Sequence, residues 1–330
     1  MLKFSLIIPV YNIEDKISKC LDSILNQSFV DFEALIIIDG STDCSEAICK
    51  KYAEKDNRLK IFEKENGGLV SARKYGSRVA QGDYIINIDG DDYIDSGYLY
   101  EVNKIITEYN PDMIAFGYNE ISNYQKNFFN KLPQGIYRDN DLECIVKSLI
   151  YDKRFRGFCG GALIATIWTK VVRAEIYKTY QNLIPDNISV GEDLLLNSHL
   201  LGHINSLYIS EKCFYNYVVY DSSMMHKYNI ENAKHYLDVA YELRKIDYID
   251  GNDVNVYLLD AIISELLKIV RSSDNYLDFK EIVLNNCDIN QMMFFAKKAK
   301  IKKTNIETLI KTVLIHLNSY RLVYVILNLL

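Results

Sequence analysis

Hydrophobic and polar residues alternate in blocks along the first 116 residues of the chain. Short apolar runs, which have the length and composition of buried β-strands, lie at 4–10, 33–38, 59–64, 84–88 and 112–118. Apolar residues at helical spacing predict helices at 13–27, from Asp43 or Ser45 to about Lys55, at 69–80 and at 96–109. Strands alternating with helices of this length predict βαβ units and a mostly parallel sheet, that is, an α/β fold.

The rest of the chain has a different pattern. Residues 119–185 have no readable periodicity, and a helix is predicted to begin at or just after Glu192-Asp193. After about residue 226 the pattern becomes mostly helical, most clearly at 256–270 and 304–330. We therefore expect an α/β region over 1–226, with halves 1–118 and 119–226, and a helical region over 227–330.

Composition narrows the class of protein. The chain has 330 residues, of which 49% are hydrophobic, so a substantial core is expected. Its net charge of −6 and pI of about 5.5 argue against sequence-independent nucleic-acid binding. The seven scattered cysteines include no CxxC pair, which favours reduced thiols in the cytoplasm. The apolar runs are too short for a signal peptide or a membrane span, so we expect a soluble or peripheral protein.

Two acidic loops follow predicted strands, at 39–43 and 89–92. Ligands of parallel sheets bind at the carboxyl ends of the strands, and no glycine-rich dinucleotide or P-loop motif occurs there. Asp89, Asp91 and Asp92 would need a counter-charge, and Mg²⁺ or Mn²⁺ could supply it while holding a diphosphate. The alternative is a solvated loop in which one aspartate caps the next helix. This motif alone leaves both interpretations open.

Five motifs in order make the interpretation more specific. They are SLIIPVYN (5–12), IIIDGSTDCS (36–45), ENGGLVSARKYG (65–76), GDYIINIDGDD (82–92) and GEDLLLN (191–197). Together they resemble family 2 glycosyltransferases, which are inverting bacterial enzymes with the GT-A fold, over roughly residues 4–230. The WTK and YNYVVYDSS segments resemble the branch that builds capsular or other surface polysaccharides. The resemblance implies a nucleotide-sugar half at 1–118 and an acceptor half at 119–226.

The resemblance also implies roles for residues of the donor site. Pro9, Val10 and Tyr11 match positions that line the nucleotide pocket. Asp39 matches the acidic residue that contacts uracil, and Arg73 matches a nucleotide-binding arginine. Uridine diphosphate is therefore the expected nucleotide.

Further matches concern the metal and the transfer step. Asp89 and Asp91 match a DXD-type pair, with Asp89 and the adjacent Gly90 near the nucleotide and Asp91 on a divalent cation, Mn²⁺ or Mg²⁺. Asp193 matches the general base, while Glu192 supports the site or binds the acceptor, and the two could exchange roles. A base carboxylate has to lie away from the metal, which would otherwise lower its pKa. Without the other motifs, Glu192-Asp193 would be read as an ordinary acidic helix start.

Two positions remain less defined. Trp168 is expected to face the acceptor or to lie in the core, and His226 matches a basic position near the diphosphate. Two residues depart from the family pattern: Ile38, where many relatives carry an acidic residue, and Lys74, where asparagine is common. These departures put the contacts to the base, and hence the choice of nucleotide, in question.

The sequence therefore predicts a metal-dependent inverting glycosyltransferase that transfers a sugar from a UDP-sugar to a glycan or lipid-linked acceptor. The alternatives are a sugar nucleotidyltransferase and a catalytically silent binding protein of the same fold. Lysines at 296–303 precede an apolar-rich tail, which fits either contact with the inner face of the cell membrane or packing against the protein body or a second copy in a homo-oligomer.

Overall fold

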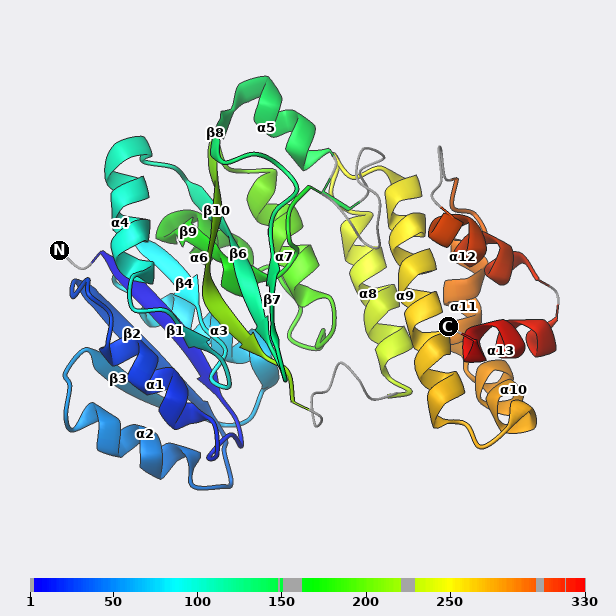
Figure 1. The fold of residues 1–330 in the computed structure, drawn as a ribbon, viewed down its shortest axis with the longest axis horizontal. Helices are drawn as coiled ribbons and strands as arrows, with labels where there is room; N and C mark the ends of the chain where they lie inside the picture. Colours follow the sequence, from blue (N-terminus) through cyan, green and yellow to red (C-terminus); the bar gives the residue numbers. More distant parts are fainter. Residues whose placement is uncertain are drawn as a thin grey trace. The chain divides into compact units, whose positions relative to one another are not determined.

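The computed structural model describes residues 3–147, 149–150, 162–220, 229–300, 306–317 and 319–329 (Figure 1). The chain divides into two compact units. The first combines residues 1–146 with 163–220, and the second combines 147–162 with 221–330. All described residues proposed above for chemistry lie in the first unit.

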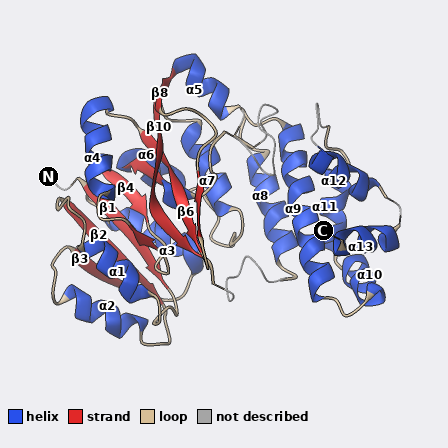
Figure 2. Cartoon of the chain, in the orientation of Figure 1, coloured by secondary structure: helices blue, strands red, loops and turns tan. Residues whose placement is uncertain are grey.

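A ten-stranded sheet forms the centre of the first unit, as far as the chain is described (Figure 2). Its strands are β1 (Phe4–Val10), β2 (Phe32–Asp39), β3 (Leu59–Lys64), β4 (Tyr84–Asn87), β5 (Tyr93–Ile94), β6 (Met113–Ile121), β7 (Gln125–Phe128), β8 (Gly135–Arg138), β9 (Lys170–Arg173) and β10 (Ser206–Val218). The main order is β3-β2-β1-β4-β9-β6-β10-β5, and β7 and β8 pair with β6 and β10. Strands β3, β2, β1 and β4 are parallel, as are β6 and β10, whereas β9 runs antiparallel between β4 and β6.

Helices cover both faces of this sheet. The first four are α1 (Ile17–Leu25), α2 (Ser45–Ala53), α3 (Gly68–Val79) and α4 (Tyr98–Tyr109). Leu6 and Ile8 of β1 belong to the core that includes residues of α1 and α4. Ile7 lies on the opposite face, where a Cβ on Gly76 of α3 would come within 2.6 Å of its side chain. Buried on both faces, β1 and β2 therefore read as continuous apolar runs.

All five predicted strands and all four predicted helices of the first 118 residues are present. The helix predicted from Ile13 begins four residues later, at Ile17. The N–H of Ile13 donates to Ser45 Oγ (2.9 Å) and that of Glu14 donates to Asp43 Oδ2 (3.0 Å). Because Asp43 and the first residue of α2 bind these donors, the chain after β1 turns before it becomes helical.

The middle of the chain holds elements that the sequence did not predict. They are β7, β8, α5 (Asp139–Val146), a 3₁₀ turn (Ile167–Thr169), β9, α6 (Ala174–Gln181) and β10. Most are four to eight residues long, too short for periodicity to identify. The predicted helix at Glu192-Asp193 is confirmed as α7 (Glu192–Leu201), which follows Gly191 in a left-handed conformation (φ 85°).

The described part of the second unit is helical, as predicted. It comprises α8 (Asn232–Leu243), α9 (Gly251–Ser272), α10 (Tyr276–Asn285), α11 (Cys287–Ala296), α12 (Ile306–His316) and α13 (Tyr320–Asn328). Helices α8, α11, α12 and α13 all contact the long α9. Among the described residues, none of the helices combines the length and the apolar character that a membrane crossing requires.

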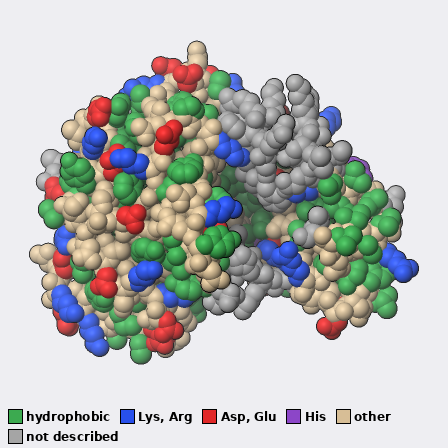
Figure 3. Space-filling model, in the orientation of Figure 1, with side chains coloured by type: hydrophobic (Ala, Val, Ile, Leu, Met, Phe, Trp, Pro, Cys, Tyr) green, Lys and Arg blue, Asp and Glu red, His purple; other side chains and the backbone are tan. Residues whose placement is uncertain are grey.

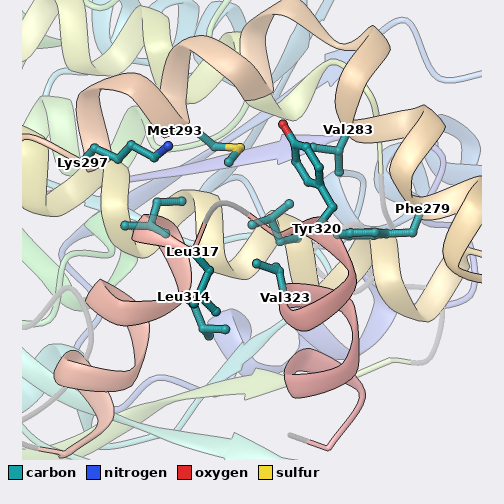
Figure 4. A pocket seen from close by; sticks show the side chains of 10 residues that line it. Phe279, Val283, Met293, Lys297, Leu314, Leu317, Tyr320 and Val323 are labelled. Atoms are coloured by element: carbon teal, nitrogen blue, oxygen red, sulfur yellow. The ribbon is translucent and has the colours of Figure 1, made fainter.

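A cavity of about 140 Å³ lies among the helices of the second unit (Figure 4). Its lining is mostly apolar, with Phe279, Leu314 and Val323 among the contributors, and it also includes Lys297. Among the described residues, its lining holds no carboxylate and no histidine. On the face of the molecule shown in Figure 3, acidic and basic side chains are interspersed over the first unit.

Candidate active site

The loops that follow β1 and β4 meet at Gly90. A Cβ on this residue would lie 3.0 Å from the carbonyl oxygen of Pro9 and 2.5 Å from Ile13 Cδ1. Glycine is therefore the residue that allows the acidic turn 89–92 to lie directly against the end of β1. This contact brings the predicted nucleotide loop and the predicted metal loop together.

Arg73, from the middle of α3, connects this turn to the start of α7. Its Nη2 donates to Asp89 Oδ1 (3.0 Å), and its Nη1 donates to Asp193 Oδ1 (2.8 Å). Glu192 Oε1 lies 3.7 Å from the same Nη1. The Arg73 side chain is 2% exposed. Three carboxylates, from the turn after β4 and from the start of α7, therefore share one buried guanidinium. The predicted contact of Arg73 with the nucleotide stays a prediction.

Burial and mutual repulsion set the electrostatics of this cluster. Burial by itself lowers the pKa of Arg73, but Asp193, Asp89 and Glu192 outweigh it, so the net shift is upward. Burial raises the pKa of Glu192, and the adjacent charge of Asp193 raises it further, while Arg73 opposes both. Burial likewise raises the pKa of Asp89. The guanidinium is thus the group that permits several carboxylates to be charged here.

Asp91 is the most accessible carboxylate of the acidic turn. Its side chain is 39% exposed, and Lys16 Nζ lies 3.8 Å from its Oδ2. Among the described residues, no group of three or more His, Cys, Asp or Glu side chains is arranged to hold a metal ion. A lone exposed carboxylate still fits Mg²⁺ or Mn²⁺, because such ions are often held by one or two carboxylates together with substrate phosphates.

Asp92 has a structural task that the sequence did not reveal. Its Oδ2 accepts a hydrogen bond from the Tyr215 hydroxyl (2.8 Å), and its Oδ1 accepts from the N–H of Val218 (2.8 Å). The same hydroxyl accepts from the N–H of Asp89 (3.0 Å). Burial, followed by the charges of Asp89 and Asp91, raises the pKa of Asp92 to about 8. Tyr215 and Asp92 therefore fasten the acidic turn to β10.

Asp39 contacts the loop that leads into α3. Its carboxylate accepts from the N–H groups of Gly67 (3.0 Å) and Gly68 (2.8 Å) and forms an ion pair with Lys64. The predicted contact of Asp39 with uracil stays a prediction.

The remaining predicted donor residues lie at the end of β1 or outside the described chain. Pro9 is half-buried, Val10 is buried, and Tyr11 is 52% exposed. His226 lies outside the described residues. Their predicted contacts with the nucleotide stay predictions.

Trp168 lies beside the acidic turn and β10. Its indole ring is stacked on Tyr215 (centroids 4.4 Å apart) and Tyr217 (5.8 Å) and meets Tyr118 edge-on (4.9 Å). The residue is 6% exposed. The indole ring thus packs against the Tyr215 ring. The predicted contact of Trp168 with an acceptor sugar stays a prediction.

The two residues departing from the family pattern have contacts of their own. Lys74 Nζ donates to Asp186 Oδ1 (2.7 Å), and Ile38 is buried in β2. Lys74 thereby ties α3 to the segment that precedes α7.

Comparison with known proteins identifies the family of this chain. The model of "Glycosyl transferase family 2" matches residues 5–179, more than half of the chain. Glycosyltransferase GlyA of Streptococcus pneumoniae serotype 4 is 32% identical over 70% of this chain and 31% of its own length. Uncharacterized glycosyltransferase EpsJ of Bacillus subtilis is 29% identical over 58% of this chain and 54% of its own. The chain thus matches about a third to a half of these curated relatives.

Solved structures of low sequence identity share the fold. Residues 1–349 of S. aureus TarS in complex with UDP-GlcNAc superpose with a TM-score of 0.60 at 20% identity, covering 90% of this chain and 91% of that one. The mannosyltransferase PcManGT of Pyrobaculum calidifontis in complex with GDP-Man and Mn²⁺ superposes with a TM-score of 0.53 at 14% identity, covering 99% and 85%. The chain has the GT-A fold and belongs to glycosyl transferase family 2.

Proposed function

We propose that the protein is a metal-dependent inverting glycosyltransferase that transfers a sugar from a UDP-sugar to a hydroxyl of a glycan or lipid-linked glycan. One observation carries the proposal: Arg73 contacts Asp193, the candidate base, at 2.8 Å and Asp89, in the candidate donor loop, at 3.0 Å. A base and a donor site that share one arginine are close enough to act on the same sugar.

Uridine is the proposed nucleoside because a structural neighbour, TarS, holds UDP-GlcNAc. A sequence relative is the poly(ribitol-phosphate) beta-N-acetylglucosaminyltransferase TarS of S. aureus, 26% identical over 65% of this chain. On this proposal Pro9, Val10, Tyr11 and Asp39 contact the nucleoside, and Gly90 allows the acidic turn to pack against the loop that holds it.

The proposed reaction is a single in-line displacement. The Asp193 carboxylate takes the proton from the acceptor hydroxyl as that oxygen attacks the anomeric carbon. The bond from this carbon to the diphosphate oxygen breaks, and its electron pair leaves with the nucleoside diphosphate. Attack opposite the leaving group inverts the anomeric centre. Positioning of the two substrates and stabilisation of the departing charge supply most of the rate enhancement.

Three acidic residues divide the remaining tasks in this proposal. Asp91 would hold the divalent cation, which when bound neutralises the charge of the departing diphosphate. Asp89 contacts the nucleotide and keeps Arg73 in place. Glu192, whose pKa is raised by burial, stays protonated to a higher pH than an ordinary glutamate and can donate a hydrogen bond to the acceptor. Trp168 is proposed to lie near the acceptor, and His226 is proposed to lie near the diphosphate.

The biological setting proposed is synthesis of bacterial surface polysaccharide, since relatives include the minor teichoic acid biosynthesis protein GgaB of Bacillus subtilis, 39% identical over 32% of this chain. Contact with the inner face of the membrane is proposed for the C-terminal helices, since Leu322, Val325 and Leu329 are 51%, 47% and 82% exposed. Replacing these three by serine should abolish flotation with anionic liposomes. Unchanged flotation would contradict the contact.

A donor screen tests the proposed activity. Wild-type protein with Mn²⁺ is expected to release UDP from at least one UDP-sugar, and chelation of the metal is expected to stop the release. Release of pyrophosphate from a nucleoside triphosphate and a sugar 1-phosphate would instead identify a nucleotidyltransferase. If the protein binds a UDP-sugar tightly but turns it over with none of a panel of glycan acceptors, it would be identified as a binding protein.

A further inference from the structure

Lys170 is a buried lysine that the proposed reaction does not use. It is 1% exposed and lies at the start of β9. Its Nζ donates to the carbonyl oxygens of Ile164 (2.7 Å) and Thr166 (3.1 Å) and to Thr169 Oγ1 (2.5 Å). Burial lowers the pKa of Lys170 to about 7. In its ammonium form the side chain has three N–H donors, and here each meets one oxygen. Lys170 therefore fixes both ends of the segment 164–166.

Asn197 fixes the middle of the same segment. It lies one turn after Asp193 in α7 and is 1% exposed. Its Nδ2 donates to the carbonyl oxygen of Ala165 (2.6 Å) and to the carbonyl oxygen of Asp193 (2.9 Å). One amide thus joins the segment 164–166 to the helix that carries the candidate base.

The next N–H along the chain completes the arrangement. With its three preceding carbonyls held, Ile167 directs its N–H to Asp193 Oδ2 at 3.1 Å. The other oxygen, Oδ1, accepts from Arg73 at 2.8 Å. The Asp193 carboxylate is therefore held at both oxygens, which fixes its plane as well as its position.

We infer that Lys170 and Asn197 are positioning residues for the candidate base, acting through the N–H of Ile167 to orient the Asp193 carboxylate. This inference rests on the proposed function, because it gives the orientation a use. It gives a role to the buried polar residue in each of two motifs: Lys170 in the WTK segment and Asn197 in the GEDLLLN segment. Misplacement of a reacting group by about 1 Å can lower the rate about 100-fold. A fixed orientation of the Asp193 carboxylate is therefore expected to increase the rate of transfer.

The first measurement is hydrogen exchange at the Ile167 amide, followed in peptides from 163–170. Lys170→Met and Asn197→Leu are expected to raise this exchange rate at least about tenfold relative to wild type, because the hydrogen bond to Asp193 loses its support. Lys178→Met is the matched control, since Lys178 also donates to a backbone carbonyl (Ala80, 2.7 Å) but outside this segment. Unchanged exchange in both test variants would overturn the inference.

The second measurement separates positioning from general damage to the fold. Below the unfolding temperature of each variant, Lys170→Met and Asn197→Leu are expected to lower kcat for UDP release at least about tenfold while the donor KM stays within about twofold. Equal loss in kcat and in donor affinity, or loss matched by Lys178→Met, would contradict positioning. If the wild type releases no nucleotide, the proposed function fails, while the exchange measurement still decides the contact.

Discussion

Replacement of Arg73 by methionine removes the buried cation that three half-buried carboxylates share. Methionine keeps most of the volume and the flexibility of the side chain, so packing changes little. What remains is Asp89, Asp193 and Glu192 facing one another, with side-chain exposures of 27%, 19% and 14%. The perturbation is therefore mainly electrostatic.

Its magnitude follows from the contacts of Arg73. Two carboxylates lie at hydrogen-bonding distance, 3.0 and 2.8 Å, and the third lies at 3.7 Å. Removing one partner of a buried ion pair costs about 3–5 kcal/mol, so Arg73→Met is expected to lose about that much free energy of unfolding at pH 8. For a unit of this size the melting temperature should fall by about 6–20 °C.

Thermal unfolding at pH 8 and pH 5.5 is the assay, with Arg173→Met as the control. Arg173 pairs with the single carboxylate of Asp112 at 3.1 Å and is 25% exposed, so its loss should cost about 1 kcal/mol. At pH 5.5 the Arg73 variant should recover part of its loss, because its carboxylates can take up protons. A loss at pH 8 no larger than that of the control, or an equal loss at both pH values, would refute the reasoning.

Two further predictions concern groups near this cluster. Tyr215→Phe should lower the free energy of unfolding by about 1–3 kcal/mol in urea titrations, because it leaves the buried Asp92 without one donor; no loss would contradict the anchoring role. Glu192 has a raised pKa in the folded state, so between about pH 4.5 and that value the native protein binds more protons than the unfolded chain, and stability falls as pH rises. Glu192→Gln should remove this slope, up to about 1.4 kcal/mol per pH unit, and an unchanged slope would contradict it.

The sequence predicted the first half of the fold well because apolar runs there are long and regular. Strands buried on both faces, such as β1 and β2, leave continuous hydrophobic segments that few other structures produce. The strands between Gln125 and Arg173 are four residues long, and two of them, β8 and β9, pair with strands far away in sequence. No local pattern specifies such contacts, so residues 119–185 could not be read.

The sequence predicted which residues belong to the site. It did not predict the hydrogen bonds and ion pairs that connect them. The motifs predict that Arg73 contacts the nucleotide, which stays a prediction. They did not predict its contacts with Asp89 and Asp193, which lie 16 and 120 residues away in sequence. Tyr215 carried no signal beyond an aromatic-rich strand. Burial decides these roles: a guanidinium 2% exposed has to meet carboxylates, and exposure is a property of the fold rather than of the sequence.

The central claim is that Asp91 and Asp193, on different elements, serve different steps. Calorimetric titration of UDP with Mn²⁺, paired with UDP release from an active donor, tests it in one pair of variants. Asp91→Ala is expected to abolish metal-dependent UDP binding, and Asp193→Asn is expected to keep binding within about threefold while kcat falls at least about 1,000-fold. Equal loss of UDP affinity in both variants, or turnover that survives in Asp193→Asn, would contradict the account.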